Sequence, residues 1–238
     1  MILERKSYMD FKQIAKDFRS ERGVPEEPAI AELEQLNELF ALAQAGANEI
    51  GTKLENLDSE FQVKHDHNPI HHIEERIKSV QSLMKKLDKK GLDRRVENIE
   101  DNISDVAGLR VVTNYLDDIY LVEKILVNQS DVTLLKRKDY VKNPKPSGYR
   151  SLHLVVSVPV FQASGSQDVK VEIQIRTVGM DMWASLEHKL RYKTDINQEL
   201  VDQYGSNLQE YSDELEEIET KMQKIYQHLN EDGEIKRS

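Results

Sequence analysis

The strongest constraint on the fold of this chain is a stretch of strict alternation, DVKVEIQIRT, at residues 168–177. Its apolar residues Val169, Val171, Ile173 and Ile175 fall on one side of an extended strand, and polar residues stand between them. This period of two predicts a strand with one buried face. The chain must therefore contain a β-sheet that carries polar side chains on the face opposite its core.

Further strands and helices surround this stretch in the middle of the chain. GLRVVTN (108–114) is typical of a strand, and SLHLVVSVPV (151–160) is a continuous apolar run of the kind found in buried strands. DVTLLKRKDYV (131–141) predicts a strand that runs into a charged loop. Helical spacing predicts helices over 117–129 and 178–192. We therefore expect an α+β fold.

Both flanks of this middle region have helical spacing. Apolar residues recur at helical intervals through an N-terminal segment (1–61), with a break at Gly23 and Pro25 that ends its first helix. The middle forms a second unit (62–193). A sustained heptad pattern predicts one long C-terminal helix (194–238), with a role in oligomerisation. The heptad residues are Val201, Tyr204, Leu208, Tyr211, Leu215, Ile218, Met222, Ile225 and Leu229.

The distribution of charge indicates a local anionic ligand. The net charge of −10 argues against a general nucleic-acid binder, so we expect no stable nucleic-acid partner. Cations nevertheless gather in 76–95 and 136–150, whereas 194–220 contains acids and neither Lys nor Arg. Basic stretches inside an acidic protein are typical of a binding site for a small anion. A solvated helix face explains some of these cations equally well: Lys85, Lys86, Lys89 and Lys90.

Neither a membrane segment nor an export signal is visible. No apolar run is long enough to span a bilayer, and the start MILERKSYMDFK is charged where a signal peptide would be apolar. The chain has no cysteine, which excludes disulfides and thiolate metal sites. We expect a cytoplasmic protein without a membrane partner.

One loop combines cations with an aromatic ring at the mouth of a strand. KNPKPSGYRSLHLVV (142–156) places Lys142, Lys145 and Arg150 around two prolines, a glycine and Tyr149. A surface turn requires the glycine but not the tyrosine. A flat ring among cations is suited to holding a nucleotide base beside its phosphates.

Carboxylates on two predicted strands suggest a metal site. Glu172, Gln174 and Arg176 share one face of the alternating strand, although a solvated sheet face would give the same pattern. Asp105 stands just before a glycine turn and a strand that carries Arg110. Two carboxylates from neighbouring strands are sufficient to hold Mg²⁺ against a nucleoside triphosphate.

Five blocks of sequence, in order, resemble the (p)ppGpp synthetase domain of the RelA/SpoT homologues. The chain is similar to a stand-alone small alarmone synthetase, closer to the RelP type than to the RelQ type. Residues 62–193 are then the (p)ppGpp synthetase domain. The five blocks are RIKS (76–79), DVAGLRVV (105–112), KPSGYRSLHL (145–154), VEIQIRT (171–177) and MDMWASLEHKLRYK (180–193).

The resemblance implies a fold and a reaction. The fold is a nucleotidyltransferase-like mixed β-sheet flanked by helices. The reaction is that of a GTP pyrophosphokinase, in which ATP donates its β,γ-diphosphate to the ribose 3′-hydroxyl of GDP or GTP and AMP leaves. By match to the family motifs, Asp105 and Glu172 are the Mg²⁺ ligands, and Glu172 is also the general base.

The resemblance also implies which residues bind the two nucleotides. Tyr149 stacks on guanine, and Arg76 and Arg110 sandwich adenine, while Lys78 contacts the ATP phosphates. Gln174 and Arg176 support the site. The implied ATP-binding residues are Arg76, Lys78, Ser79 and Arg110. The implied GDP- or GTP-binding residues are Tyr149, Lys145, Arg150, His153, Gln174 and Arg176.

The resemblance points to a homotetramer, and the heptad helix is the best candidate for building it. Because the flanks of its apolar seam are acidic, two such helices in parallel would repel each other. We therefore expect antiparallel or heterotypic packing of the seam against the N-terminal helices rather than a parallel zipper.

Other functions fit the sequence less well. A catalytically silent nucleotide- or RNA-binding regulator should have lost Asp105 or Glu172, and both are present. An RNA nucleotidyltransferase should carry paired acids after a Gly-Ser turn, but Gly165-Ser166 has no such pair. The dipeptide His65-Asp66 resembles the HD motif of alarmone hydrolases. Too few residues precede it for that helical domain, so we expect synthesis without hydrolysis.

The sequence leaves several finer points open. The sequence does not decide which of GDP, GTP and GMP is the preferred acceptor. It also does not decide whether the product activates the enzyme. One of Lys136, Arg137 and Lys138 is expected to contact ATP, and His188 is either a packing residue or a site residue. Four histidines are candidate ligands for a transition metal: His65, His67, His71 and His72.

Overall fold

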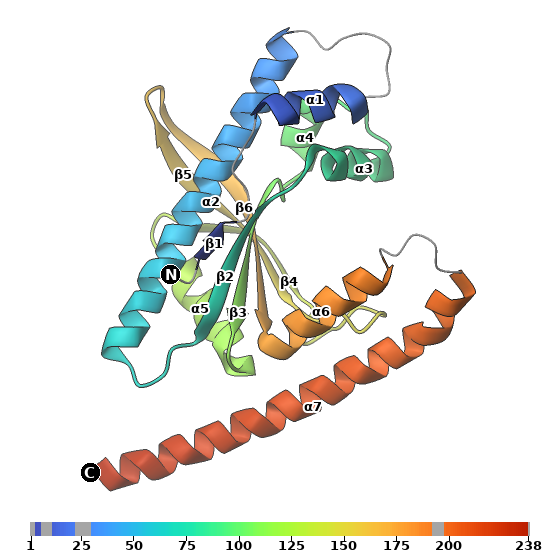
Figure 1. Cartoon of the computed structure of the whole chain (residues 1–238). Coiled ribbons are helices and arrows are strands. Elements are labelled where there is room, and N and C mark those ends of the chain that lie inside the picture. Colours follow the sequence, from blue (N-terminus) through green and yellow to red (C-terminus); the bar gives the residue numbers. More distant parts are fainter. Residues whose placement is uncertain (1–2, 6–10, 22–29, 192–197, 238) are drawn as a thin grey trace.

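A computed structural model describes residues 3–5, 11–21, 30–191 and 198–237 of the chain. Its centre is a six-stranded mixed sheet with strand order β1-β2-β3-β6-β5-β4 (Figure 1). Two pairs, β1 with β2 and β3 with β6, are parallel, and the other neighbours are antiparallel. The strands are β1 (Leu3–Arg5), β2 (Ile70–Ile77), β3 (Ala107–Thr113), β4 (Thr133–Asp139), β5 (Leu152–Gln162) and β6 (Gly165–Thr177).

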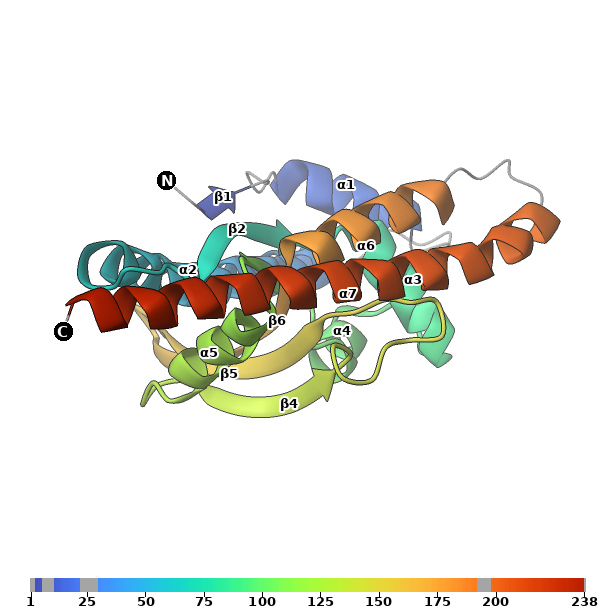
Figure 2. The same ribbon diagram turned by 90° about the horizontal axis from the view of Figure 1, so that it is seen from below.

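Helices flank this sheet, which confirms the expected α+β class with a mixed sheet. The long helix α2 crosses one face of the sheet, while α6 and α7 lie toward the end where β6 finishes (Figures 1 and 2). The helices are α1 (Phe11–Glu21), α2 (Ile30–Lys64), α3 (Val80–Lys90), α4 (Val96–Asn102), α5 (Leu116–Val127), α6 (Val178–Arg191) and α7 (Gln198–Arg237).

The alternating stretch is the central strand β6, and its two faces have the predicted character. Val171, Ile173 and Ile175 are fully buried. The apolar face of β6 meets α2 so closely that a Cβ on Gly46 would lie 2.6 Å from Cγ1 of Val169. The polar face, which carries Glu172, points away from α2. The alternation therefore fixes which face is core and which is available for chemistry.

Two parts of the sheet differ from the sequence-based expectation. The N-terminal segment is not wholly helical, because β1 pairs in parallel with β2 at the sheet edge. Three residues give no periodicity signal, and only the unpaired edge of β2 makes them a strand. The loop QASGSQD (162–168), which the sequence predicts between the strands 151–160 and 168–177, is also shorter than expected, since β6 already begins at Gly165, which pairs with Gln162. Gly165 has φ +124°, which allows a two-residue turn there.

The heptad helix is confirmed as α7, but its seam does not pack against the N-terminal helices. Most of the apolar side chains along the seam are exposed, from 49% for Tyr211 to 66% for Leu229, whereas Leu208 and Leu215 are half-buried. Instead, α7 packs on α6 and α5 through polar residues such as Glu219 and Gln223, and on the loop before β5 through Ser212 (Figure 2). The expectation was wrong because hydrogen bonds to the rest of the subunit, not the seam, determine which face of α7 turns inward.

Within the residues that the structure describes, none of the helices has both the length and the apolarity that a bilayer span would need.

Replacement of two helical glycines by alanine is expected to change the free energy of unfolding in opposite directions. We expect Gly46→Ala to lower the free energy of unfolding by about 1 kcal/mol, because overpacking against the β-branched Val169 and Val171 exceeds the gain in helix propensity. Gly205→Ala in α7 meets no atom within 4 Å and should raise that free energy by up to about 1 kcal/mol. Chemical denaturation at one protein concentration measures both. A stabilising Gly46→Ala would contradict the close approach of α2 to β6.

Candidate active site

A cavity of about 660 Å³ opens on the polar face of the sheet, over β2, β3 and β6. A second cavity of about 330 Å³ adjoins it toward β4 and β5. The two cavities share part of their walls, so a ligand in one would lie next to a ligand in the other. The shared lining residues are Asp105, Lys145, His153, Glu172 and Gln174.

Asp105 lies just before β3 and is held by two lysines. Lys78, which follows β2, and Lys86 of α3 both bind Oδ2, the latter at 2.7 Å. Oδ1 is buried and has no hydrogen-bond partner among the described residues. Burial by itself would raise the pKa of Asp105, but the hydrogen bonds and charges of the two lysines outweigh it, and the pKa lies below its usual value. The carboxylate is therefore charged at neutral pH.

Glu172 is the second acid, in the middle of β6. Its Oε2 accepts a hydrogen bond from Nε2 of Gln174 at 2.9 Å, and its Oε1 lies 3.4 Å from Nδ1 of His153. Burial would raise the pKa of Glu172, and the negative charge of Asp105 acts in the same direction. The contacts with His153 and Gln174 outweigh both, so that the pKa is lowered. Two ionised carboxylates thus share one cavity.

These two acids fit a hard divalent cation. They offer oxygen donors only, and the buried Oδ1 of Asp105 is an acceptor that nothing in the described part of the chain satisfies. The described residues contain no group of three or more His, Cys, Asp or Glu that could hold a metal. Mg²⁺ does not need such a group, because it keeps several waters and takes phosphate oxygens beside one or two carboxylates.

The candidate histidine cluster is not gathered into one site. Nε2 of His67 lies 2.9 Å from Oδ1 of Asp118, on α5. His71 and His72 contact each other through their Nδ1 atoms at 2.8 Å. His67, His71 and His72 are therefore engaged in two separate places.

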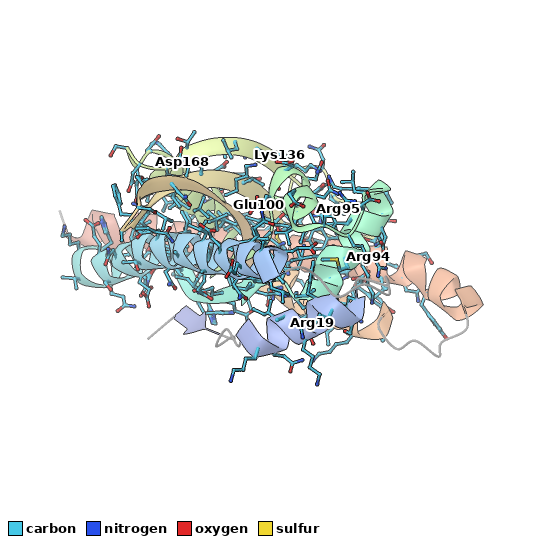
Figure 3. All side chains as sticks on the ribbon, turned by 90° about the horizontal axis from the view of Figure 1, so that it is seen from above. Arg19, Arg94, Arg95, Glu100, Lys136 and Asp168 are labelled. Carbon is cyan, nitrogen blue, oxygen red and sulfur yellow. The ribbon has the colours of Figure 1, made fainter. Side chains whose placement is uncertain are left out.

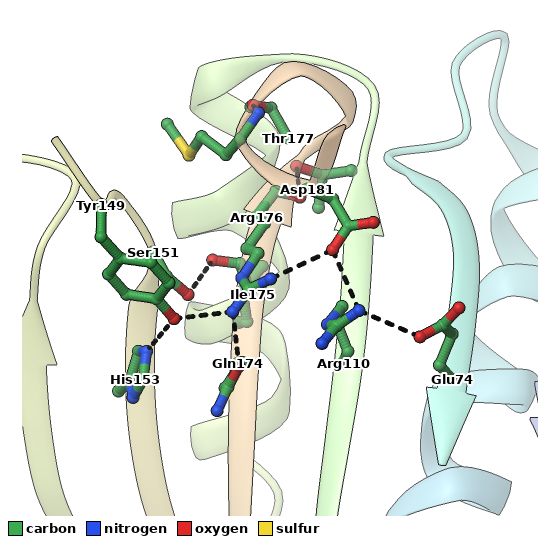
Figure 4. A network of polar contacts seen from close by, with 12 residues as sticks. Glu74, Arg110, Tyr149, Ser151, His153, Gln174, Ile175, Arg176, Thr177 and Asp181 are labelled. Carbon is green, nitrogen blue, oxygen red and sulfur yellow. Dashed lines mark hydrogen bonds and ion pairs between the residues drawn. The ribbon is translucent and has the colours of Figure 1, made fainter. Parts of the chain in front are cut away.

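A chain of polar contacts links four strands and α6 across the cavity (Figure 4). Nη1 of Arg110 lies 3.1 Å from Oε2 of Glu74 and 3.2 Å from Oδ1 of Asp181. The same Asp181 oxygen accepts from Nη1 of Arg176 at 3.1 Å. Arg110 on β3 is thus fixed from two sides, with its guanidinium at the larger cavity.

The same chain continues to the ring of Tyr149. Nη2 of Arg176 donates to Oη of Tyr149 at 2.7 Å and to Oε1 of Gln174 at 2.8 Å. Nε2 of His153 lies 2.8 Å from the same Oη. Over the Tyr149 ring, Nζ of Lys145 stands 4.5 Å from the centroid. The predicted acceptor residues Tyr149, Lys145, His153, Gln174 and Arg176 are therefore brought together.

Most of the predicted site residues reach the larger cavity, but two do not. Ser79 caps the N-terminus of α3, where its Oγ accepts from the Ser82 backbone N–H. Arg150 is buried and points to α7 rather than into either cavity. The predicted residues that line the larger cavity are Arg76, Lys78, Asp105, Arg110, Lys145, Tyr149, His153, Glu172, Gln174 and Arg176.

The structure also shows which cations of the two basic stretches, 76–95 and 136–150, reach the cavities. In the first, Lys86 reaches Asp105 whereas Lys85, Lys89 and Lys90 are exposed, and Arg94 pairs with Asp88 near α1 (Figure 3). In the second, Lys136 and Lys138 line the smaller cavity.

Between those two lysines, Arg137 binds Glu123 and Asp139 instead. Because successive side chains of a strand point to opposite faces, the predicted strand would have placed Arg137 on the face opposite Lys136 and Lys138. Glu74, Asp181 and His188 also line or support the larger cavity. No sequence signal singled out Glu74 or Asp181.

A family model and two curated relatives with similar sequences point to the same family. A family model described as a region found in RelA / SpoT proteins matches residues 75–197. The chain is 41% identical to GTP pyrophosphokinase YwaC of Bacillus subtilis over 169 residues, 69% of this chain and 80% of that protein. It is 36% identical to GTP pyrophosphokinase YjbM of the same organism over 183 residues, 77% of this chain and 84% of that protein.

Solved structures are similar over most of the chain. The small alarmone synthetase 1 of Bacillus subtilis bound to its product pppGpp matches with a TM-score of 0.74 and 33% identity, over 82% of this chain and 98% of that chain. The small alarmone synthetase 2 of the same organism matches with a TM-score of 0.69 and 36% identity, over 79% and 97%.

The contacts of Asp105 predict how its pKa responds to substitution. Lys86→Met should raise the pKa of Asp105, because burial is then opposed by Lys78 alone. Lys90→Met, at an exposed position of the same helix, should leave it unchanged. Carbon NMR of the carboxyl groups during a pH titration measures both. An equal pKa in the wild type and Lys86→Met would show that this lysine does not hold Asp105 in solution.

Proposed function

The chain belongs to the RelA/SpoT family, and on this premise we propose that it is a synthetase-only GTP pyrophosphokinase that makes the alarmones ppGpp and pppGpp. The ribose 3′-oxygen of GDP or GTP attacks the β-phosphorus of ATP. The bond from that phosphorus to the bridging oxygen of the α-phosphate breaks, and AMP leaves. The observation that carries the proposal is the pair of ionised acids, Asp105 and Glu172, in the wall between two cavities bordered by cations.

We propose that residues 62–193 form the synthetase domain, between an N-terminal segment (1–61) and a C-terminal segment (194–238). The larger cavity is suited to ATP. Arg110 is fixed by Glu74 and Asp181, so its guanidinium plane is in place for stacking on adenine together with Arg76. Lys78 stands beside Asp105 and would contact the phosphates.

The acceptor half is centred on Tyr149. Its hydroxyl is held by Arg176 and His153, so the ring has a fixed orientation for stacking on guanine. The ammonium of Lys145, which stands over that ring, would yield its place to the base. The smaller cavity, lined by Lys86, Lys136, Lys138 and Lys145, would take phosphate groups.

Asp105 and Glu172 would hold Mg²⁺ between the two nucleotides. The bound ion would neutralise charge that develops on the transferred diphosphate. The lowered pKa of Glu172 keeps the carboxylate ionised, which lets it accept the proton of the 3′-hydroxyl. Because GDP, GTP and ATP are cytoplasmic nucleotides, we place the activity in the cytoplasm.

Loss of either acid should abolish synthesis. With ATP, GDP and Mg²⁺, chromatography of the nucleotides should show AMP and ppGpp appearing together. Asp105→Asn and Glu172→Gln should each leave less than about a tenth of the turnover, because both lose charge at the metal and the second also loses the base.

The matched control is Asp168→Asn. Asp168 lies on the same strand as Glu172 but is exposed and lines neither cavity, and its variant should keep full activity. Substantial turnover in Asp105→Asn or Glu172→Gln would exclude the mechanism. A silent nucleotide- or RNA-binding regulator would bind nucleotides without forming AMP.

We further propose that the subunit assembles into a homotetramer through the exposed apolar side chains of α6 and α7. The seam of α7 includes Ile218, Met222 and Ile225, which are between 52% and 60% exposed. On α6, Met182 and Leu186 are about as exposed. Apolar side chains at heptad spacing along one helix are typical of an interface between subunits.

Charges on the seam should therefore reduce the assembly. Ile218→Asp with Met222→Asp should lower the molecular mass measured by light scattering after size exclusion, because each carboxylate would be buried without a partner. Ser206→Asp with His228→Asp adds the same side chains at exposed polar positions of α7 and should leave the mass unchanged. An unchanged mass in the seam variant would rule out α7 as the interface.

A further inference from the structure

Helix α7 reaches the loop that carries Tyr149, and it contacts the residues on both sides of that tyrosine. We infer that Ser212, Asp213 and Glu216 of α7 are positioning residues for the acceptor nucleotide. They touch neither cavity themselves and act by holding Gly148 and Arg150. This inference deepens the proposed function and rests on its assignment of Tyr149 to the acceptor.

The first contact is between Ser212 and the backbone of Gly148. Oγ of Ser212 donates to the Gly148 carbonyl at 2.6 Å, and both residues are buried. Gly148 has φ +89°, a conformation that side chains disfavour. A Cβ there would lie 2.9 Å from Cα of Gln209 and 3.0 Å from Cβ of Ser212. Glycine at this position therefore lets the loop lie directly on the backbone of α7.

The second contact involves the charge of Arg150. Its side chain is only 9% exposed, and Nη2 lies 2.8 Å from Oδ1 of Asp213 and 2.7 Å from Oε2 of Glu216. Nη1 donates to the Val141 carbonyl at 3.1 Å, at the other end of the loop. A guanidinium this deeply buried requires counter-charges, and α7 supplies them. The family resemblance implied that Arg150 binds GDP or GTP, whereas its contacts tie the loop to α7.

Tyr149 is consequently held from two directions. Its backbone lies between two residues anchored on α7, and its hydroxyl is bound by Arg176 and His153 on the sheet. A ring fixed at both ends offers a preorganised face for stacking, which reduces the entropy that binding must remove. Release of the α7 contacts would remove the anchors on the backbone side and leave the contacts of the ring and its hydroxyl.

The docking of α7 does not depend on these loop contacts alone. The indole Nε1 of Trp183, on α6, donates to the Leu208 carbonyl at 2.8 Å. Glu219 accepts from the Gly179 backbone N–H at 3.0 Å, and the rings of Tyr226 and Tyr115 stack at 4.4 Å. Neutral side chains at 213 and 216 should therefore loosen the loop while α7 remains in place.

The test compares two double variants that remove the same charge from the same helix. Asp213→Asn with Glu216→Gln should raise the KM for GDP by about tenfold, a loss within the range expected when the Tyr149 ring no longer stacks well on the base. The KM for ATP and the kcat at saturating GDP should change by less than about twofold, because the ATP half and the acids are untouched. Glu210→Gln with Glu214→Gln, at exposed positions of α7, should match the wild type.

Two further measurements separate positioning from a general structural role. Trp183 is the only tryptophan, so an unchanged emission maximum in the variant reports that α7 stays docked on α6. Asp213→Glu with Glu216→Asp retains both charges and should restore most of the affinity for GDP.

An unchanged KM for GDP in the neutral variant would overturn the inference. So would a red-shifted Trp183 emission with equal losses for both nucleotides, since this would show a merely structural role. If the wild type formed no AMP or ppGpp, the proposed function would fail by itself. Calorimetric binding of GDP to the same variants would still decide whether α7 positions the loop.

Discussion

Asp105 and Glu172 are like charges that share the walls of two adjoining cavities, and burial acts on both to favour the neutral acid. Each remains ionised only because neighbouring donors outweigh that effect. Lys78 and Lys86 do so for Asp105, while His153 and Gln174 do so for Glu172. These four donors come from different parts of the sequence, so the charge state of the site depends on the assembled sheet.

The strand order brings those parts together. β3 and β6 are parallel neighbours in the middle of the sheet, with Gly108 opposite Glu172, so Asp105, just before β3, comes close to the acid on β6. β2 and β5 lie on either side of this pair, so that β2 brings Arg76 to the larger cavity and β5 brings His153 to both cavities. α2 buries the opposite face of the same strands. One sheet therefore provides a core on one side and a charged reaction site on the other.

Helix α7, like the sheet, has two faces with different roles. Its polar residues turn inward and hold the loop around Tyr149, whereas its apolar seam turns outward. A helix that met a second subunit along this seam would touch the acceptor loop with its other face. The proposed interface and the proposed positioning residues thus lie on one helix, which gives assembly a direct physical connection to acceptor binding.

The sequence by itself determined the α+β class, the central strand with its two faces, the long C-terminal helix, and a motif set that identifies the family. These features are local. Apolar residues recur every two residues in the strand and every 3.5 residues in the helix, and the family motifs are short blocks of sequence. It also named most residues that line the larger cavity. Only the tertiary structure decided that Arg150 faces α7. It also decided that Lys136 and Lys138 line the smaller cavity, whereas Arg137 binds Glu123 outside it. In the larger cavity, it placed Glu74 and Asp181 against Arg110. It also decided that β1 is a strand and that the heptad seam faces outward. The reason is that a cation's role depends on which acid lies within a few ångströms of it, and those acids are supplied by distant segments whose approach no local pattern encodes.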